Sequence, residues 1–184
     1  MTDTIAIVEQ LRSDAVRQVP PFGSDGVRMA AAAGEAVSSA LLGELQGDSF
    51  VALLALEALR AADRTAFERL PPSRRAQIYA RALADSEMFN TWGAPQRLSD
   101  TAHAFAALGA DAVGVLLPLL EDRRDAPQEG SRNATASQLD RVRVRDYAWM
   151  LLCAASGRTC EWTRDPAVRD VAIDALAAEL GGSR

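Results

Sequence analysis

The chain has 184 residues, of which 48% are hydrophobic and 5% aromatic, and its formal net charge is −5. This length suits one domain with its own core, and the hydrophobic content excludes an intrinsically disordered chain. The acidic balance disfavours a nucleic-acid partner, because phosphate binding needs a concentrated basic surface. All 20 basic residues are arginine, which together with abundant alanine indicates a GC-rich, bacterial genome.

In the first half of the chain, apolar residues at three- and four-residue spacing predict helices. The expected helical segments cover residues 3–18, 26–45, 50–62, 64–70 and 72–86. Gly34 and Gly43 lie inside the second segment and indicate close helix packing or a break near Gly34. The third segment is apolar on nearly every side, which is typical of a central helix covered by its neighbours.

In the second half, helices are predicted over residues 100–108, 111–121, 140–155 and 166–180. Turn signals predict a loop over 87–98, where Phe89 and Trp92 either plug the core or form an aromatic contact surface. Pro118 is expected to bend its helix. Residues 122–138 contain hardly any large apolar side chain, so we expect a long loop that is mobile or ordered by a partner.

Two helices in this half resemble a HEAT-like repeat. The first helix of such repeats carries a G-x-x-A-V start, an L-L pair and an interior proline, matched here by Gly109, Ala112, Val113, Leu116, Leu117 and Pro118. The second helix reads D, then V-R-x-x-A-x-x-L-L, matched by Asp140, Val144, Arg145, Ala148, Leu151 and Leu152. A weaker copy lies within residues 34–59, and residues 72–108 resemble a third, degenerate pair.

The resemblance implies an all-α fold in a single domain over residues 1–184. The expected architecture is a short HEAT-like α-solenoid of about three antiparallel helix pairs plus terminal helices. In such repeats the Asp and Arg tie adjacent repeats together, a role carried here to Asp140 and Arg145. α-Solenoids often bind proteins on a concave face lined by the second helices, and the candidate contacts are Arg60, Trp92, Arg143 and Asp146.

The two cysteines, Cys153 and Cys160, are too few for a disulfide scaffold. We expect Cys153 to be a buried thiol and Cys160 to lie in a loop, both reduced. One histidine and two cysteines fall short of a four-ligand zinc site, so no metal or cofactor is expected. The N-terminus lacks the basic start of a secretory signal, and no run approaches the ~20 apolar residues of a membrane span. The expected protein is soluble and cytoplasmic.

The sequence contains no recognisable catalytic motif. His103, the only histidine, lies in a predicted helix with no nucleophile motif around it, and there is no Gly-rich phosphate loop and no metalloprotease motif. The alternating Arg141, Arg143 and Arg145 have two interpretations. They pair with Asp140 and Asp146, or they form a phosphate or carboxylate site.

The leading hypothesis is a non-catalytic protein–protein interaction module or adaptor with a protein partner. One alternative is a nucleic-acid or nucleotide-directed enzyme on a helical-repeat scaffold. Another is an immunity-type inhibitor of a basic toxin. The sequence leaves the oligomeric state open.

Overall fold

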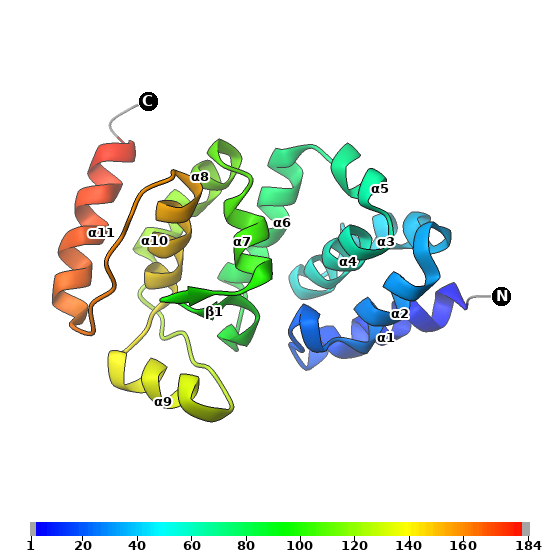
Figure 1. Cartoon of the computed structure of the whole chain (residues 1–184), viewed down its shortest axis with the longest axis horizontal. Helices are drawn as coiled ribbons and strands as arrows, with labels where there is room; N and C mark the ends of the chain where they lie inside the picture. Colours follow the sequence, from blue (N-terminus) through cyan, green and yellow to red (C-terminus); the bar gives the residue numbers. More distant parts are fainter. Residues whose placement is uncertain (1–2, 182–184) are drawn as a thin grey trace. The chain divides into compact units, whose positions relative to one another are not determined.

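A computed structural model of the chain describes residues 3–181, apart from the side chains of residues 131–133 and 136. The chain divides into two compact units, Met1–Ser86 and Glu87–Arg184, each of which is described by itself. Helices account for 72% of the structure and strands for 3%, so the predicted all-α class is confirmed. Figure 1 shows helices in both units. The single domain and the HEAT-like solenoid stay predictions.

The first unit is built from helices only, within its described residues. Two short 3-10 helices, η1 (Pro21–Gly23) and η2 (Gly34–Val37), separate longer elements. The α-helices are α1 (Thr4–Val16), α2 (Asp25–Ala33), α3 (Ser38–Glu44), α4 (Ser49–Ala62), α5 (Arg64–Arg69) and α6 (Pro72–Ala84).

Helix α4 is the centre of this unit, as its uniformly apolar sequence predicts. It packs against α1, α2, α3, α5 and α6, and its residues from Ala52 to Leu59 are all buried. The Asp48 side chain caps it by accepting hydrogen bonds from the backbone N–H groups of Phe50 and Val51. The expected helix over 26–45 is broken at Gly34, whose φ of 64° ends α2.

The second unit begins with η3 (Phe89–Trp92) and a two-stranded antiparallel hairpin, β1 (Gly93–Ala94) and β2 (Arg97–Leu98). The helices that follow are α7 (Asp100–Ala106), α8 (Ala110–Leu116), η4 (Leu117–Glu121), α9 (Ser131–Asp140), α10 (Val144–Ala155) and α11 (Pro166–Gly181). The hairpin lies inside the segment that the sequence predicts as a loop. The α-helical part ends at Leu116 and continues as 3-10 helix through Pro118. The bend predicted at Pro118 stays a prediction.

Helix α10 is central to this unit. It packs against α7, α8, η4 and α11, and Tyr147, Leu151 and Leu152 on it are fully buried. In Figure 1 the segment that follows α10 runs between α10 and α11 before α11 begins. Most of the candidate functional residues lie at or next to the ends of these two helices.

The segment predicted as a loop over 122–138 contains α9, which is a correction. Backbone hydrogen bonds hold the residues that precede α9 against those that follow it. The Ala126 N–H donates to the Val142 carbonyl at 2.9 Å, and the Val144 N–H donates to the Arg124 carbonyl at 3.0 Å. The prediction considered only apolar burial, whereas hydrogen bonds satisfy this polar segment. Asp140 ends α9 rather than starting α10, because Arg141 adopts a left-handed conformation with φ of 49°.

Among the described residues, no single helix has both the length and the apolar composition of a membrane span. One pair, Asp100–Ala106 with Ala110–Glu121, meets these two criteria together but is bent by 103°.

Candidate functional site

Four of the residues singled out in the sequence, Asp140, Arg143, Arg145 and Asp146, lie together where α9 meets α10. The structure adds three residues of α11 to them, Arg169, Asp170 and Asp174. The same tripeptide, Val-Arg-Asp, occurs at residues 144–146 and 168–170. We call these the first and second V-R-D motifs.

The two motifs exchange ion pairs. Arg169 of the second motif donates from Nε to Asp146 Oδ1 of the first at 3.0 Å. Arg145 of the first motif donates from Nη1 to Asp170 Oδ1 of the second at 3.2 Å. Asp146 and Arg169 are 0% exposed. A buried pair of this kind is tolerated only when hydrogen bonds satisfy both charges, and these reciprocal pairs clamp α10 to α11.

Within the clamp, Arg169 has a hydrogen-bond partner for every donor, whereas Arg145 Nε is buried without one. Its remaining N–H groups donate to four backbone carbonyls, those of Asp140, Arg141, Thr163 and Arg164, at 2.7 to 3.1 Å. Its guanidinium carbon lies 4.6 Å from the centroid of the Trp162 ring. The side chain therefore uses all five of its donors, and it fixes the segment between α10 and α11 as well as the helices.

Arg143 precedes α10 and extends the clamp. Its backbone N–H donates to Asp146 Oδ2 at 2.8 Å, which caps the helix, and its Nη2 lies 2.7 Å from Asp170 Oδ1. Burial alone lowers the pKa of Arg143, but the hydrogen bonds to Asp146 and Asp170 raise it well above the ordinary value. The hydrogen bond from Arg143 correspondingly lowers the pKa of Asp170.

The roles carried over from HEAT-like repeats are divided in the structure. Arg145 joins α10 to α11, since its Nη2 also lies 2.7 Å from Asp174 Oδ1. Asp140 accepts hydrogen bonds from Gln96 Nε2 at 3.3 Å and Trp162 Nε1 at 3.2 Å. That these contacts tie adjacent repeats together stays a prediction.

Two candidate contacts lie away from this cluster. In the first unit, Arg60 Nη2 donates to Glu57 Oε2 at 2.5 Å, and Glu57 Oε1 accepts from the Tyr79 hydroxyl at 2.6 Å. Burial, and then the Glu57 carboxylate, raise the pKa of Tyr79 well above its usual range. In the second unit, Trp92 is 0% exposed and lies near Phe105. Trp92 thus plugs the core, which corrects its proposed use as a contact surface.

The cysteines form a disulfide, Cys153–Cys160, with Cα atoms 6.0 Å apart, so the expectation of two reduced thiols is corrected. The chain turns back after α10 at Gly157, whose φ is 67°, and the Arg158 N–H donates to the Cys153 carbonyl at 2.8 Å. The sequence carried a signal for this turn, a glycine at the helix end with a second cysteine three residues later. We call residues 153–160 the disulfide loop.

Two open hollows lie on either side of the disulfide loop and share Arg158, Thr159 and Cys160. The α11-side hollow has a volume of about 570 Å³ and is also lined by Trp149, Glu161, Ala172, Ala175, Leu176 and Glu179. The hairpin-side hollow has a volume of about 500 Å³ and is also lined by Pro95, Gln96, Arg97, Leu98, His103, Met150, Cys153 and Ala154. A third, of about 360 Å³, lies beside α9.

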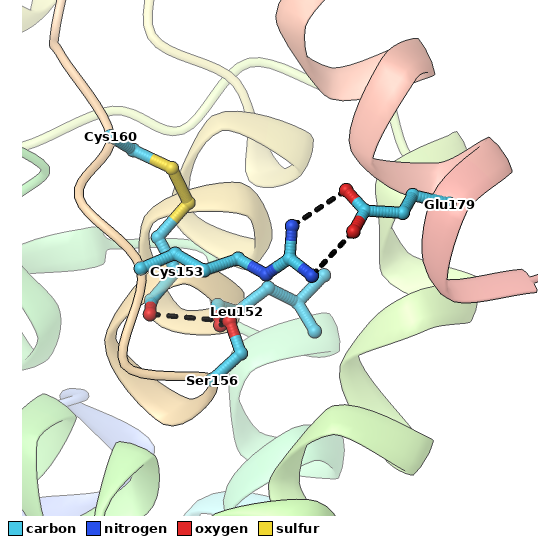
Figure 2. The surroundings of a disulfide bond; sticks show 6 residues. Leu152, Cys153, Ser156, Cys160 and Glu179 are labelled. Carbon is cyan, nitrogen blue, oxygen red and sulfur yellow. Dashed lines mark hydrogen bonds and ion pairs between the residues drawn. A yellow bond between two sulfur atoms is a disulfide. The ribbon is translucent and has the colours of Figure 1, made fainter. Parts of the chain in front are cut away.

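Figure 2 shows Glu179 of α11 facing the disulfide loop. The two terminal nitrogens of Arg158 lie 2.6 and 2.7 Å from the two carboxylate oxygens of Glu179. This pair lowers the pKa of Glu179 and raises that of Arg158, through their hydrogen bonds first and their charges second. An ion pair thus reaches from the disulfide loop to α11.

Within residues 3–181, apart from the four side chains left out above, no group of three or more His, Cys, Asp or Glu side chains is placed to hold a metal. His103 is exposed, and its Nδ1 lies 2.8 Å from the Ser99 carbonyl. The sequence reasoning missed Arg169, Asp170 and Asp174, for which the recurring V-R-D tripeptide was the available signal. Comparison with known proteins finds no matching family model, no matching curated protein and no matching solved structure.

Proposed function

We propose that the protein is a non-catalytic protein-binding module that contacts its partner through the disulfide loop and the two hollows beside it. The observation that supports this most is the shared wall. Arg158, Thr159 and Cys160 line both hollows, so the two form one surface on either side of a single loop.

The lining of this surface suits a segment of another protein. Apolar side chains such as Met150 and Leu176 line the hollows together with charged ones, as in the contact patches of non-obligate complexes. Sites for small molecules are typically more enclosed and more uniformly apolar. A bound polypeptide segment would cross the loop and place side chains on both sides of it.

Charge differs between the two sides. Among the described residues, the hairpin-side hollow is lined by Arg97 and Arg158 and by no Asp or Glu, whereas the α11-side hollow is also lined by Glu161 and Glu179. Arg158 and Glu179 pair with each other. We therefore expect an acidic group of the partner near Arg97 on the hairpin side and a basic or polar group near Glu161 on the α11 side. The carboxylates of Glu161 and Glu179 would also suit a basic partner, as the hypothesis of an inhibitor of a basic toxin requires.

The clamp between the V-R-D motifs supports the same proposal. It fixes α10 and α11 through buried charges and anchors the segment between them, so the surface is formed before a partner arrives, which lowers the cost of association. The nucleotide-enzyme alternative has less support, because Arg60, Arg143 and Arg145 already contact carboxylates of their own unit.

We also propose that the helices follow HEAT-like pairing. The packing of α10 against α8 and η4 on one side and against α11 on the other supports it. The recurrence of the V-R-D motif at the start of successive helices points the same way.

Site-specific photo-crosslinking tests the protein-binding function. A photoreactive amino acid replaces Thr159 on the shared wall, or Thr65 in α5 as a matched control, since both are exposed threonines. Each variant is irradiated in lysate of the source organism. Any protein captured from Thr159 is then identified, purified and mixed with the wild-type chain for hydrogen exchange.

The expected result is a protein captured from Thr159 and not from Thr65, which then slows amide exchange in residues 158–161. Equal capture from both positions, or no protection of residues 158–161 by the purified protein, would contradict the proposal.

A further inference from the structure

We propose that the Cys153–Cys160 disulfide is a redox-modification site, and that a dithiol reductant opens it and releases the wall shared by the two hollows. Where this concerns binding, it rests on the function proposed above. The opening of the loop is a property of the chain alone and can be measured without a partner.

The two sulfurs differ in accessibility. Cys153 belongs to the buried part of α10 and is 2% exposed, whereas Cys160 is partly exposed and lines both hollows. A reductant therefore reaches Cys160 from either side of the loop without any unfolding of α10. Thiol–disulfide exchange depends on such access and on which sulfur is attacked.

The step is balanced by the two thiols of the reductant. A thiolate of the dithiol attacks Cys160 Sγ, the bond between the two cysteine sulfurs breaks, and Cys153 leaves as a thiolate that takes up a proton. The second thiol of the reductant, as its thiolate, then attacks the mixed disulfide. It releases Cys160 as a thiol and leaves the reductant as a disulfide. Two electrons pass from the dithiol to the cysteine pair.

Apart from the disulfide, backbone hydrogen bonds hold the loop as far as Arg158, whose N–H donates to the Cys153 carbonyl at 2.8 Å, and exposed side-chain contacts hold the rest. Arg158, Thr159 and Glu161 are exposed, and the ion pair of Arg158 with Glu179 joins side chains that are 37% and 59% exposed. Exposed pairs contribute little to stability. Beyond the loop, Trp162 is held by Asp140 and stacks on Arg169. Reduction should therefore free residues 157–161 and leave α10, α11 and the clamp in place.

This role requires a compartment that supplies a dithiol reductant. In a reducing cytoplasm, disulfides that do form are usually transient, catalytic or redox-sensing. The Cys153–Cys160 bond joins residues only 7 positions apart, so its loss costs the fold less than the loss of a bond that closes a long loop.

The test compares the full-length chain before and after treatment with dithiothreitol, without denaturant. Iodoacetamide labelling with intact mass measurement gives the thiol count, circular dichroism gives the helix content, and hydrogen exchange gives local opening. We expect no labelled cysteine before treatment and a labelled Cys160 after it, with unchanged helix content, because Cys153 stays buried in α10. Exchange at residues 158–161 should then accelerate by roughly tenfold or more, as expected for a segment that opens locally.

The double variant Cys153→Ser, Cys160→Ser is the matched control. It should exchange at residues 158–161 as fast as the reduced wild type and should not respond to dithiothreitol. The proposal is overturned if Cys160 labels in untreated protein, if its labelling after reduction requires denaturant, or if reduction leaves exchange in residues 158–161 unchanged.

A binding measurement with the captured partner distinguishes the proposed binding function from the proposed redox control. If Thr159 captures a partner, its affinity for reduced protein should be lower than for oxidised protein by roughly tenfold, which corresponds to about 1.4 kcal/mol. Equal affinity in both states would overturn redox control while leaving the binding function intact. Capture of no partner would contradict the binding function while leaving the loop-opening result unaffected.

Discussion

At the scale of single residues, neighbouring arginines in this chain have opposite environments. Arg145 and Arg169 are buried and contact carboxylates across the α10–α11 junction, whereas Arg158 is exposed on the disulfide loop. The sequence around each arginine does not predict this difference, because all three lie at the start or just after the end of a helix rich in small residues. The difference comes from which carboxylates the fold brings near each one.

Loss of the Asp146 charge should destabilise the second unit strongly. Asp146→Asn leaves Arg169 as a buried charge without its counter-ion, and breaking such a pair costs about 3–5 kcal/mol. Trp92, Trp149 and Trp162 all lie in this unit, so urea unfolding followed by tryptophan fluorescence reports on it. Glu179→Gln, which removes an exposed charge, is the control and should change the unfolding midpoint little. A comparable shift in both variants would contradict the clamp.

The clamp should also make stability depend on pH. The hydrogen bond from Arg143 lowers the pKa of Asp170 in the folded protein, so the carboxylate contributes stability above its unfolded pKa of about 3.9. That contribution is lost as the pH falls through the lowered folded value. Asp170→Asn should therefore lose less stability than wild type between pH 7 and pH 3, measured by urea unfolding at each pH. Parallel pH profiles would show that Asp170 is not linked in this way.

At the scale of elements, the arrangement of the helices depends on close backbone contacts and on a disulfide, neither of which the helical pattern of the sequence predicts. Helix α2 meets α1 at Gly26, where an added Cβ would lie 2.8 Å from the backbone nitrogen of Leu11. In the second unit the disulfide closes the turn after α10. Each contact joins residues whose proximity depends on how the chain turns between elements.

Two glycines of the first unit should respond oppositely to alanine. Gly26→Ala should destabilise by roughly 1–3 kcal/mol, because the Leu11 backbone cannot yield as a flexible side chain would. Gly43→Ala in α3 meets nothing within 4 Å, and alanine in a helix should stabilise by roughly 0.5–1 kcal/mol. Thermal unfolding followed by circular dichroism compares the two. Destabilisation by both, to a similar extent, would contradict the packing of α1 on α2.

The disulfide should stabilise the second unit when it is formed. Under oxidising conditions the double variant Cys153→Ser, Cys160→Ser should lose about 2 kcal/mol, since the cross-link no longer restricts the unfolded chain. Tryptophan-monitored urea unfolding measures the difference. With dithiothreitol present, wild type and variant should coincide. A difference that persists in the reductant would assign the effect to the serine substitutions instead.

At the scale of the whole molecule, two cores organise the chain, one around α4 and one around α10. The central position of α4 was predicted from its apolar residues, whereas that of α10 was not, although apolar residues also make up most of its sequence. Helix bounds were predicted least well where polar segments form hydrogen bonds, as at α9, because sequence reasoning weighed apolar burial alone. The reciprocal ion pairs and the disulfide depend on proximity between elements, which periodicity does not encode.

The candidate site shows the same division. Asp140, Arg143, Arg145 and Asp146 were singled out from sequence, and they do lie together, but the structure gives Arg143, Arg145 and Asp146 partners within their own unit. The surface proposed for binding lies instead at the disulfide loop, where the sequence showed only a glycine and a cysteine in a predicted loop. Trp92, the most conspicuous aromatic candidate, is in the core.

The binding account is tested most directly by calorimetric titration of the partner captured from Thr159 against two arginine variants. Thr159→Arg places a bulky charge on the wall shared by the hollows, whereas Thr65→Arg makes the same change on α5. The account predicts that Thr159→Arg weakens binding by at least about tenfold, or 1.4 kcal/mol, while Thr65→Arg binds as wild type does. Wild-type affinity in Thr159→Arg, or equal losses in both variants, would contradict it.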